Sequence, residues 1–270
     1  TNPKMIFEDA RADFDVVEVS GGEVGIICQD KEGCIVFLRE SGREYLKSTL
    51  LLNKNKSVYD KHFTLLNHGK WLSVIYIVDY EGKKILSHQI VDKENQTPYA
   101  IDETANTEYF AFTDKGSNII LFYSKDNECG YRIYKWGKKE WSDYIKISDG
   151  NIIAAADDFE ENVYLLINVN GREIYLNVKY NNLEFSENYK KSNEDSCEAA
   201  VMFFEENYLW VIKENKDKLY GTKMNSEFET VSGPMFFGND VYKKRYCIKT
   251  DEKKYKLRKC YGYETNNIPK

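Results

Sequence analysis

The sequence repeats one loose pattern of apolar and polar segments roughly every forty residues, six times along the 270-residue chain. Each copy has an apolar run, a polar break, a second apolar run, a tight turn and an alternating segment. The apolar residues alternate or run on for a few positions and then stop at Gly, Asn or Asp. Because helical periodicity is not sustained over any long window, the chain is predicted to be all-β.

The second copy is the clearest. Its first strand is expected from His62 to Asn67, followed by a break at His68-Gly69 and a second strand from Trp71 to Tyr76. A turn from Asp79 to Gly82 then leads to a return strand that carries Ile85, Leu86 and Ile90. The outer strand is expected from Thr97 to Ile101. A tight hairpin needs positive φ angles, which glycine adopts without strain. The turn glycines Gly33, Gly130 and Gly171 are expected to play the part of Gly82 in other copies.

The other copies align on their first strands. These are expected at Phe14 to Val19, Tyr109 to Phe112, Ile152 to Ala156, Ala199 to Phe204 and Met235 to Phe237. The sixth copy continues with a hairpin from Tyr242 to Ile248 and from Tyr255 to Tyr261, and then lacks an outer strand. The N-terminal segment Met5-Ile6-Phe7 is expected to supply it, which would remove an exposed sheet edge.

By this repeat pattern the chain resembles the β-propeller superfamily. The resemblance implies a six-bladed β-propeller of four-stranded antiparallel blades, closed by the N-terminal segment, with residues 1–270 as a single domain. A seven-bladed count with one degenerate copy and a five-bladed count with an irregular extension remain open. The WD, kelch and YWTD motifs are missing, and the stretch from Phe112 to Ile119 departs from the Asp-box of sialidase-like propellers, so no specific family is matched.

The composition excludes several classes of function. The net charge is −6, and the 38 basic residues form no basic arm, which argues against a nucleic-acid partner. No apolar run approaches the length of a membrane-spanning helix, so no membrane insertion is expected. The start Thr1-Asn2-Pro3-Lys4 does not look like a signal peptide, which slightly favours the cytoplasm. Because the chain does not start with Met, a processed N-terminus or an excised piece of a longer protein stays open as an alternative.

Metal and cofactor chemistry find little support in the sequence. The six cysteines form no CxxC motif and are expected to be reduced, packed thiols, although Cys28 and Cys34 flank one hairpin. The histidines are His62, His68 and His88, all in the second copy but on different segments, so they are interpreted as packing or surface residues. There is no GxSxG motif and no phosphate-binding glycine loop. We therefore expect no metal and no cofactor.

Carboxylates near the first strands are the candidate catalytic groups. Glycosidases place a pair of Asp or Glu residues across the scissile bond, and a propeller would supply them from its inner strands and the following loops. The candidates are Asp157, Asp158 and Asp114, with Asp15, Glu205 and Glu206 also near strand ends. Acidic residues are common in this chain, so their position near strand ends is only weak evidence for catalysis.

Aromatic residues are the candidate binding groups. Tyr131, Tyr134 and Trp136 are interpreted as alternating on one face of a return strand, with Trp141 following in the outer strand. They are expected either to form a stacking surface for a sugar or partner chain, or to pack between blades.

These observations favour a non-enzymatic binding or scaffold module that contacts a protein or a carbohydrate partner through its loops. Fold alone does not imply function, so two alternatives stay open. One is a glycoside-active enzyme with central carboxylates, and the other is a structural or assembly domain of a longer protein.

Overall fold

The computed structural model describes residues 5–19, 23–52, 63–68, 71–91, 98–104, 108–158, 162–181, 184–197, 199–205, 207–215, 218–239, 241–249 and 257–265. Within these ranges the secondary structure is β strand, with no helix. The all-β prediction is therefore confirmed. No helix long and apolar enough to cross a membrane is found in the same ranges.

The strands form antiparallel sheets, most of them with four strands in an up-and-down order. The first sheet contains β1 (Ala10–Glu18), β2 (Val24–Asp30), β3 (Ile35–Ser41) and β4 (Glu44–Leu51). The second contains β5 (Thr64–Asn67), β6 (Leu72–Tyr80), β7 (Lys83–Ile90) and β8 (Tyr99–Glu103). The third contains β9 (Tyr109–Thr113), β10 (Ile119–Lys125), β11 (Glu128–Lys135), β12 (Glu140–Trp141) and β13 (Ile145–Asp149).

The fourth sheet contains β14 (Asn151–Asp157), β15 (Asn162–Val169), β16 (Arg172–Asn181) and β17 (Glu184–Asp195). The fifth contains β18 (Ala199–Glu205), β19 (Tyr208–Asn215), β20 (Lys218–Met224) and β21 (Thr230–Asn239). The remaining strands, β22 (Val241–Lys249) and β23 (Leu257–Thr265), pair as a two-stranded sheet.

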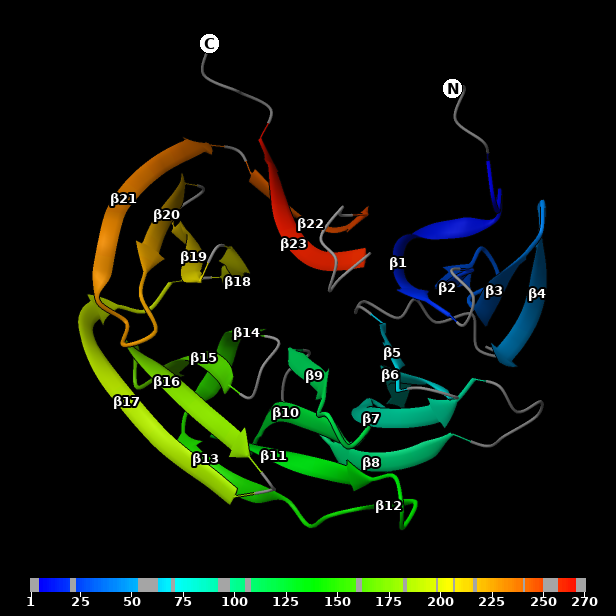
Figure 1. Cartoon of the computed structure of the whole chain (residues 1–270), viewed down its shortest axis with the longest axis horizontal. Helices are drawn as coiled ribbons and strands as arrows, with labels where there is room; N and C mark the ends of the chain where they lie inside the picture. Colours follow the sequence, from blue (N-terminus) through cyan, green and yellow to red (C-terminus); the bar gives the residue numbers. More distant parts are fainter. Residues whose placement is uncertain are drawn as a thin grey trace.

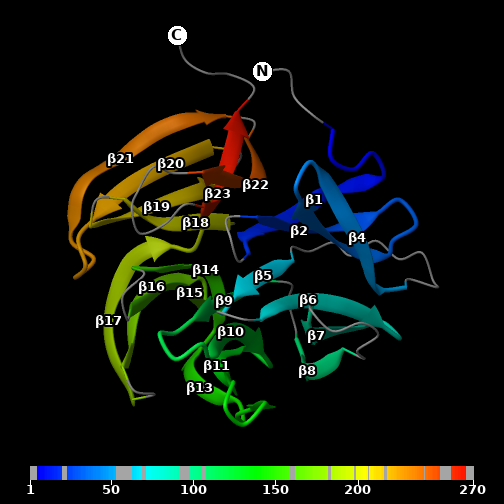
Figure 2. The same cartoon turned by 45° about the vertical axis from the view of Figure 1, so that its right-hand side comes forward.

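The sheets are arranged around a common centre, and in the five larger sheets the first strand lies innermost (Figures 1 and 2). Consecutive first strands contact one another in the order β1, β5, β9, β14 and β18. The two-stranded sheet contacts β18 through β23 and contacts β1 through both of its strands. This radial arrangement of antiparallel sheets is a propeller-like architecture.

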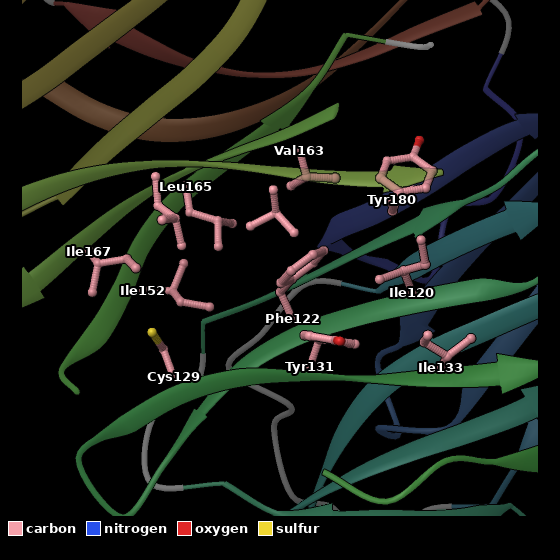
Figure 3. Close-up of a cluster of buried hydrophobic side chains, with 12 residues drawn as sticks. Ile120, Phe122, Cys129, Tyr131, Ile133, Ile152, Val163, Leu165, Ile167 and Tyr180 are labelled. Carbon is pink, nitrogen blue, oxygen red and sulfur yellow. The ribbon is translucent and has the colours of Figure 1, made fainter. Parts of the chain in front are cut away.

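The hydrophobic core lies between neighbouring sheets rather than at the centre. Figure 3 shows one such layer, where Phe122 and Tyr131 of the third sheet face Ile152, Val163 and Leu165 of the fourth. Similar layers separate the first sheet from the second, the second from the third, and the fourth from the fifth. Each of these sheets therefore packs on its neighbours through alternate residues of its strands, which supply side chains to the two faces in turn.

Polar groups also join neighbouring sheets at buried positions. The first and second sheets are joined by the Leu65 N–H, which donates to Asp15 Oδ2 at 2.6 Å. The third sheet is joined to the second by the Tyr109 hydroxyl, which donates to the Ile75 carbonyl at 2.7 Å. The fourth and fifth are joined by the ion pair of Lys213 and Glu173, at 2.5 Å. Asp15, one of the carboxylates considered for catalysis, is thus a buried link between inner strands.

Most predicted turns are confirmed, but the turn at Gly130 is wrong. Gly82 and Gly171 have φ values of 76° and 80°, as tight hairpins require. In the third sheet the turn is made by Asp126 and Asn127, with φ of 52° and 62°, because Asn and Asp tolerate this conformation. Gly130 lies inside β11, where a Cβ would come within 2.3 Å of the Ile145 carbonyl oxygen. Its role is to let β13 approach closely.

The sixth copy also differs from the prediction. Met235 to Phe237, expected to be its first strand, belongs to β21, the outer strand of the fifth sheet, with Met235 opposite Gly221. A short apolar run does not distinguish an inner strand from an outer one. The following hairpin is confirmed, since β22 pairs with β23 from Val241–Thr265 to Lys249–Leu257.

The N-terminal segment Met5-Ile6-Phe7 lies against the first sheet and not in a strand. Phe7 packs on the cluster of Cys28, Cys34, Val36 and Leu38, and its ring lies 4.7 Å from Lys47 Nζ. Met5 is 73% exposed. The expected outer strand for the last sheet is therefore not formed by this segment, whose Phe7 packs on the cluster beside β3 instead.

Four of the six cysteines are described with their side chains, and they form no disulfide. Cys28, Cys34, Cys129 and Cys197 are all buried. Burial is the main cause that raises the pKa of Cys28 to about 11 and that of Cys197 to about 12. Both thiols are therefore protonated and unreactive at neutral pH. The prediction of packed thiols is confirmed for these four.

Candidate binding site

One end of each sheet collects the candidate functional residues. An up-and-down sheet makes the turn after its first strand and the turn after its third strand at the same end, which we call the inner-turn end. Trp71 lies here, just before β6, and Trp136 lies here, just after β11. Asp114 and Asp158 follow the first strands of the third and fourth sheets at the same end. This end therefore unites aromatic and acidic side chains from separate repeats.

An aromatic cluster fills the interface between the second and third sheets at this end. Tyr134, Trp136 and Trp141 come from the third sheet, with ring centroids 5.4 Å apart for Tyr134 and Trp141 and 5.8 Å for Tyr134 and Trp136. From the second sheet, His88 lies edge-on to Tyr134 at 4.7 Å and to Trp141 at 5.5 Å. Tyr134 and Trp141 are buried, so these two residues pack between the sheets.

Tyr131 does not belong to this cluster. It is three residues before Tyr134 on β11, so the two side chains point to opposite faces of the strand. Tyr131 packs against Phe122 at 5.8 Å in the layer that faces the fourth sheet (Figure 3). The interpretation that Tyr131 shares a face with Tyr134 and Trp136 is therefore wrong.

Trp71 and Trp136 form the accessible part of the cluster. Both are half-buried, and their rings are tilted by 44° at a centroid distance of 5.8 Å. His68 lies edge-on to Trp136 at 4.4 Å. The backbone N–H of Trp136 donates to Asn118 Oδ1 at 3.1 Å, which holds the end of β11 against the turn after β9. We call Trp71 and Trp136 the tryptophan surface.

Two histidines meet behind this surface. The Nε2 atoms of His68 and His88 lie 2.8 Å and 2.9 Å from the hydroxyl oxygen of Ser73. The geometry is satisfied when Ser73 donates to the Nε2 of one imidazole and accepts from the Nε2 of the other. Burial lowers the pKa of His68, and burial followed by the charge of His68 lowers the pKa of His88 to about 3. Ser73 is fully buried, so it is placed as a structural bridge and not as an exposed nucleophile.

Two buried polar atoms of the cluster have no hydrogen-bond partner among the residues that the structure describes. They are Nδ1 of His68 and Nε1 of Trp141. Leaving such atoms unpaired costs about 1–3 kcal/mol each, so each is a polar atom that a water molecule would satisfy.

A charged network joins the same two sheets. Asp102 on β8 accepts from Lys125 at 2.8 Å, from Arg132 at 3.1 Å and from the Tyr123 hydroxyl at 2.7 Å. Burial opposes ionisation of Asp102, but the hydrogen bonds from Lys125 and Tyr123 and the nearby positive charges outweigh it, so its pKa is lowered. The network fixes β11, the strand that leads to Trp136.

The acidic candidates Asp114 and Asp158 are engaged within their own turns. The two oxygens of Asp114 accept from the backbone and side-chain nitrogens of Asn118, each at 2.8 Å. Asp158 binds Asn162 in the same way, with the backbone bond at 3.0 Å. Asp157, half-buried, is the last residue of β14. This five-residue Asp-to-Asn turn is a structural use of the carboxylates.

The sequence interpretation missed Trp71, Ser73 and the meeting of His68 with His88. The register of β6 with β7 places His88 opposite Ile75, and therefore diagonally beside Ser73. His62 and Glu206 lie outside the described residues. In the described part of the chain, no group of three His, Cys, Asp or Glu residues has the arrangement of a metal site.

No protein-family model and no curated protein matches the sequence. Solved structures of similar fold include a lectin from Burkholderia pseudomallei, 11% identical, with a TM-score of 0.56 over 86% of this chain and 71% of that chain. Another is the Aleuria aurantia lectin in complex with Fucα1-6GlcNAc, 12% identical, with a TM-score of 0.51 over 86% of this chain and 81% of that chain.

A peptidase has the same degree of similarity. The puromycin-hydrolyzing peptidase of Mycobacterium tuberculosis is 12% identical, with a TM-score of 0.51 over 86% of this chain and 41% of that chain. At such low identity these comparisons show the fold alone, an all-β arrangement of antiparallel sheets that this chain shares with those structures. The function of the chain has to be argued from its own side chains.

Proposed function

We propose that the protein is a non-enzymatic carbohydrate-binding module that holds a sugar on the tryptophan surface. The proposal rests on the half-buried pair Trp71 and Trp136, with rings 5.8 Å apart and tilted by 44°. Indole rings offer an apolar face for the C–H face of a sugar, and a polar edge for its hydroxyls. A glycan partner is also the kind that the lectins of similar fold bind.

The geometry behind the pair supports a rigid site. His68 backs Trp136, Asn118 holds the Trp136 backbone, and the Asp102 network fixes β11. A ligand that meets a surface already held in place loses less conformational entropy on binding. Nδ1 of His68, which has no partner among the described residues, adds a polar atom behind the stacking surface.

For the scaffold we propose a single six-bladed propeller over residues 1–270, with β22 and β23 as the last, smaller blade. The ring would close where these two strands contact β1, in place of the N-terminal strand expected from the sequence. The support for this count is the up-and-down order shared by the five larger sheets and the position of the two-stranded sheet between β18 and β1.

The direct test is binding of the protein to a glycan array, followed by titration of the best sugar by calorimetry. Trp71→Ala should weaken binding at least about tenfold, since aromatic anchors dominate binding energy in small interfaces. Trp141→Phe is the matched control, because Trp141 is buried in the same interface and should not touch the sugar. Melting curves of both variants report whether the fold is kept.

Two outcomes would overturn the proposal. One is an array without any bound glycan when the protein is folded. The other is a sugar whose affinity is the same for Trp71→Ala and for the unmodified protein. Hydrolysis of an aryl glycoside that stops on Asp158→Asn would instead favour the glycosidase alternative.

A further inference from the structure

The fifth sheet carries a second group of aromatic and charged side chains on one face. Phe203, Trp210 and Lys223 are directly opposite one another in the strand register. Tyr208 is two residues before Trp210, and Glu205 is opposite Tyr208. All five therefore share one face of the sheet at its inner-turn end. We call them the Trp210 platform.

The other face of this sheet is used by the core. Met202, Leu209, Val211 and Met224 pack against the fourth sheet. The Trp210 platform points away from that layer, toward the side on which β23 contacts β18. Glu205 is exposed, and the other four platform residues are half-buried. The platform is therefore accessible, unlike the buried Tyr134 and Trp141 of the other interface.

The platform side chains hold one another in a defined arrangement. The rings of Phe203 and Trp210 are nearly parallel, with an interplanar angle of 16° and a centroid distance of 6.5 Å. The Trp210 Nε1–H donates to Glu205 Oε2 at 2.9 Å, which fixes the plane of the indole. Lys223 Nζ lies 4.2 Å from the centroid of Tyr208 and 5.7 Å from that of Trp210.

Lys223 carries the positive charge of the Trp210 platform. Lys213 and Lys125, on β19 and β10, are paired with Glu173 and Asp102. Among the side chains that the structure describes, no carboxylate lies within ion-pair distance of Lys223. The ammonium group is held over aromatic rings instead. It is thus placed to pair with an anion that comes from outside.

We propose that the Trp210 platform is a second binding site, specific for an acidic saccharide. Trp210 provides the stacking surface for the sugar ring, and Lys223 pairs with the sugar carboxylate in a charge-assisted hydrogen bond. A peptide is less well suited, because the platform lies on a sheet face where the backbone groups of β18, β19 and β20 are used in the strand ladders. Strand addition needs a free edge.

The experiment compares methyl glucuronide with methyl glucoside, which differ only in the carboxylate, by calorimetric titration of the full chain. The acidic sugar should bind at least about tenfold more tightly. Lys223→Gln should reduce its affinity to that of the neutral sugar. Lys218→Gln, on the same strand but at its other end, should leave it unchanged. Added salt should weaken only the acidic sugar.

The proposal is overturned if Lys223→Gln binds the glucuronide as well as the unmodified chain does, or if both sugars bind equally or not at all. Trp210→Phe keeps an aromatic ring at this position, so it should fold and should retain part of the glucuronide binding. This inference rests on the proposed function in one respect, namely that the ligand is a carbohydrate. Loss of glucuronide binding in Trp71→Ala but not in Lys223→Gln would assign the acid to the tryptophan surface, overturning this site and leaving the proposed function intact.

Discussion

His88 shows how a single residue couples the candidate site to pH. It is 4% exposed, bridged to His68 through Ser73, and has a pKa lowered to about 3. The unfolded chain takes up a proton on this residue below about pH 6.5, while the folded protein does so only near its lowered pKa. Between these values the unfolded state binds more protons, so stability falls as the pH falls.

We therefore predict that the free energy of unfolding decreases from pH 7 to pH 4, by at most about 1.4 kcal/mol per pH unit from His88 alone. His88→Gln should flatten this dependence, while His68, whose pKa burial also lowers, keeps part of it. Urea unfolding at several pH values measures the effect. Tyr76→Phe is the control, since it removes a buried hydrogen bond to Gln89 without removing a group that titrates in this range. Equal slopes for His88→Gln and the unmodified protein would contradict the prediction.

At this scale the sequence predicted the residue types of the site better than their meeting. Trp136 and Trp141 were identifiable because tryptophan is large and the chain has only four of them. The meeting of His68 with His88 depends on the pairing of β6 with β7 and on the position of His68 directly after β5, so no spacing along the chain indicates it. The face of Tyr131 could have been predicted from the sequence, because residues an odd number of positions apart on a strand point to opposite faces.

Among the elements, the Asp-to-Asn turns offer a direct test of role. Asp158→Ala should lower the free energy of unfolding by about 1 kcal/mol, because it removes the acceptors of Asn162, whereas Asp158→Asn keeps an acceptor and most of the stability. Chemical denaturation measures both variants. Asp79→Asn, at an exposed position near the end of β6, is the control and should be neutral. No loss of stability in Asp158→Ala would show that the turn does not depend on this carboxylate.

Substitutions at two glycines compare the cost of a positive φ in a turn with the cost of a steric clash between neighbouring strands. Gly82→Ala should cost roughly 1–2 kcal/mol, because φ is 76° but no atom of the described residues lies within 4 Å of the added Cβ. Gly130→Ala should cost more, because its Cβ would meet the Ile145 carbonyl at 2.3 Å and the Tyr144 ring at 2.6 Å. Thermal denaturation ranks the two variants. A larger loss for Gly82→Ala would mean that β13 can move aside without cost.

The sequence predicted the hairpins and the central strands because these are short apolar runs bounded by Gly, Asn or Asp. It predicted outer strands less well. β17 runs from Glu184 to Asp195 with a sequence rich in charged and polar residues, and it forms by pairing along β16. The placement of Met235 to Phe237 in an inner strand failed for the related reason that apolar content does not reveal strand order.

For the whole molecule, two segments are candidates for closing the ring of sheets, the N-terminal segment and the last hairpin, and they predict opposite effects of deletion. If Met5-Ile6-Phe7 closes the ring, its loss should lower the melting temperature sharply. The structure instead has Met5 and Ile6 73% and 44% exposed, with only Phe7 packed on the first sheet. The contacts that join the two ends of the chain are those of β1 with β22 and β23.

We therefore predict that removing residues 1–6 shifts the melting temperature by no more than about 2 °C, because Met5 and Ile6, the two of these residues that the structure describes, are largely exposed. Removing residues 241–270 should cause a far larger decrease, or prevent folding, because it uncovers β1 and β18 together. Phe7→Ala measures how much the packing of the Phe7 ring on the first sheet contributes to the melting temperature, apart from residues 1–6. A sharp decrease on removing residues 1–6, with Phe7→Ala unaffected, would mean that the N-terminal segment closes the ring and that the contacts of β1 with the last hairpin are secondary.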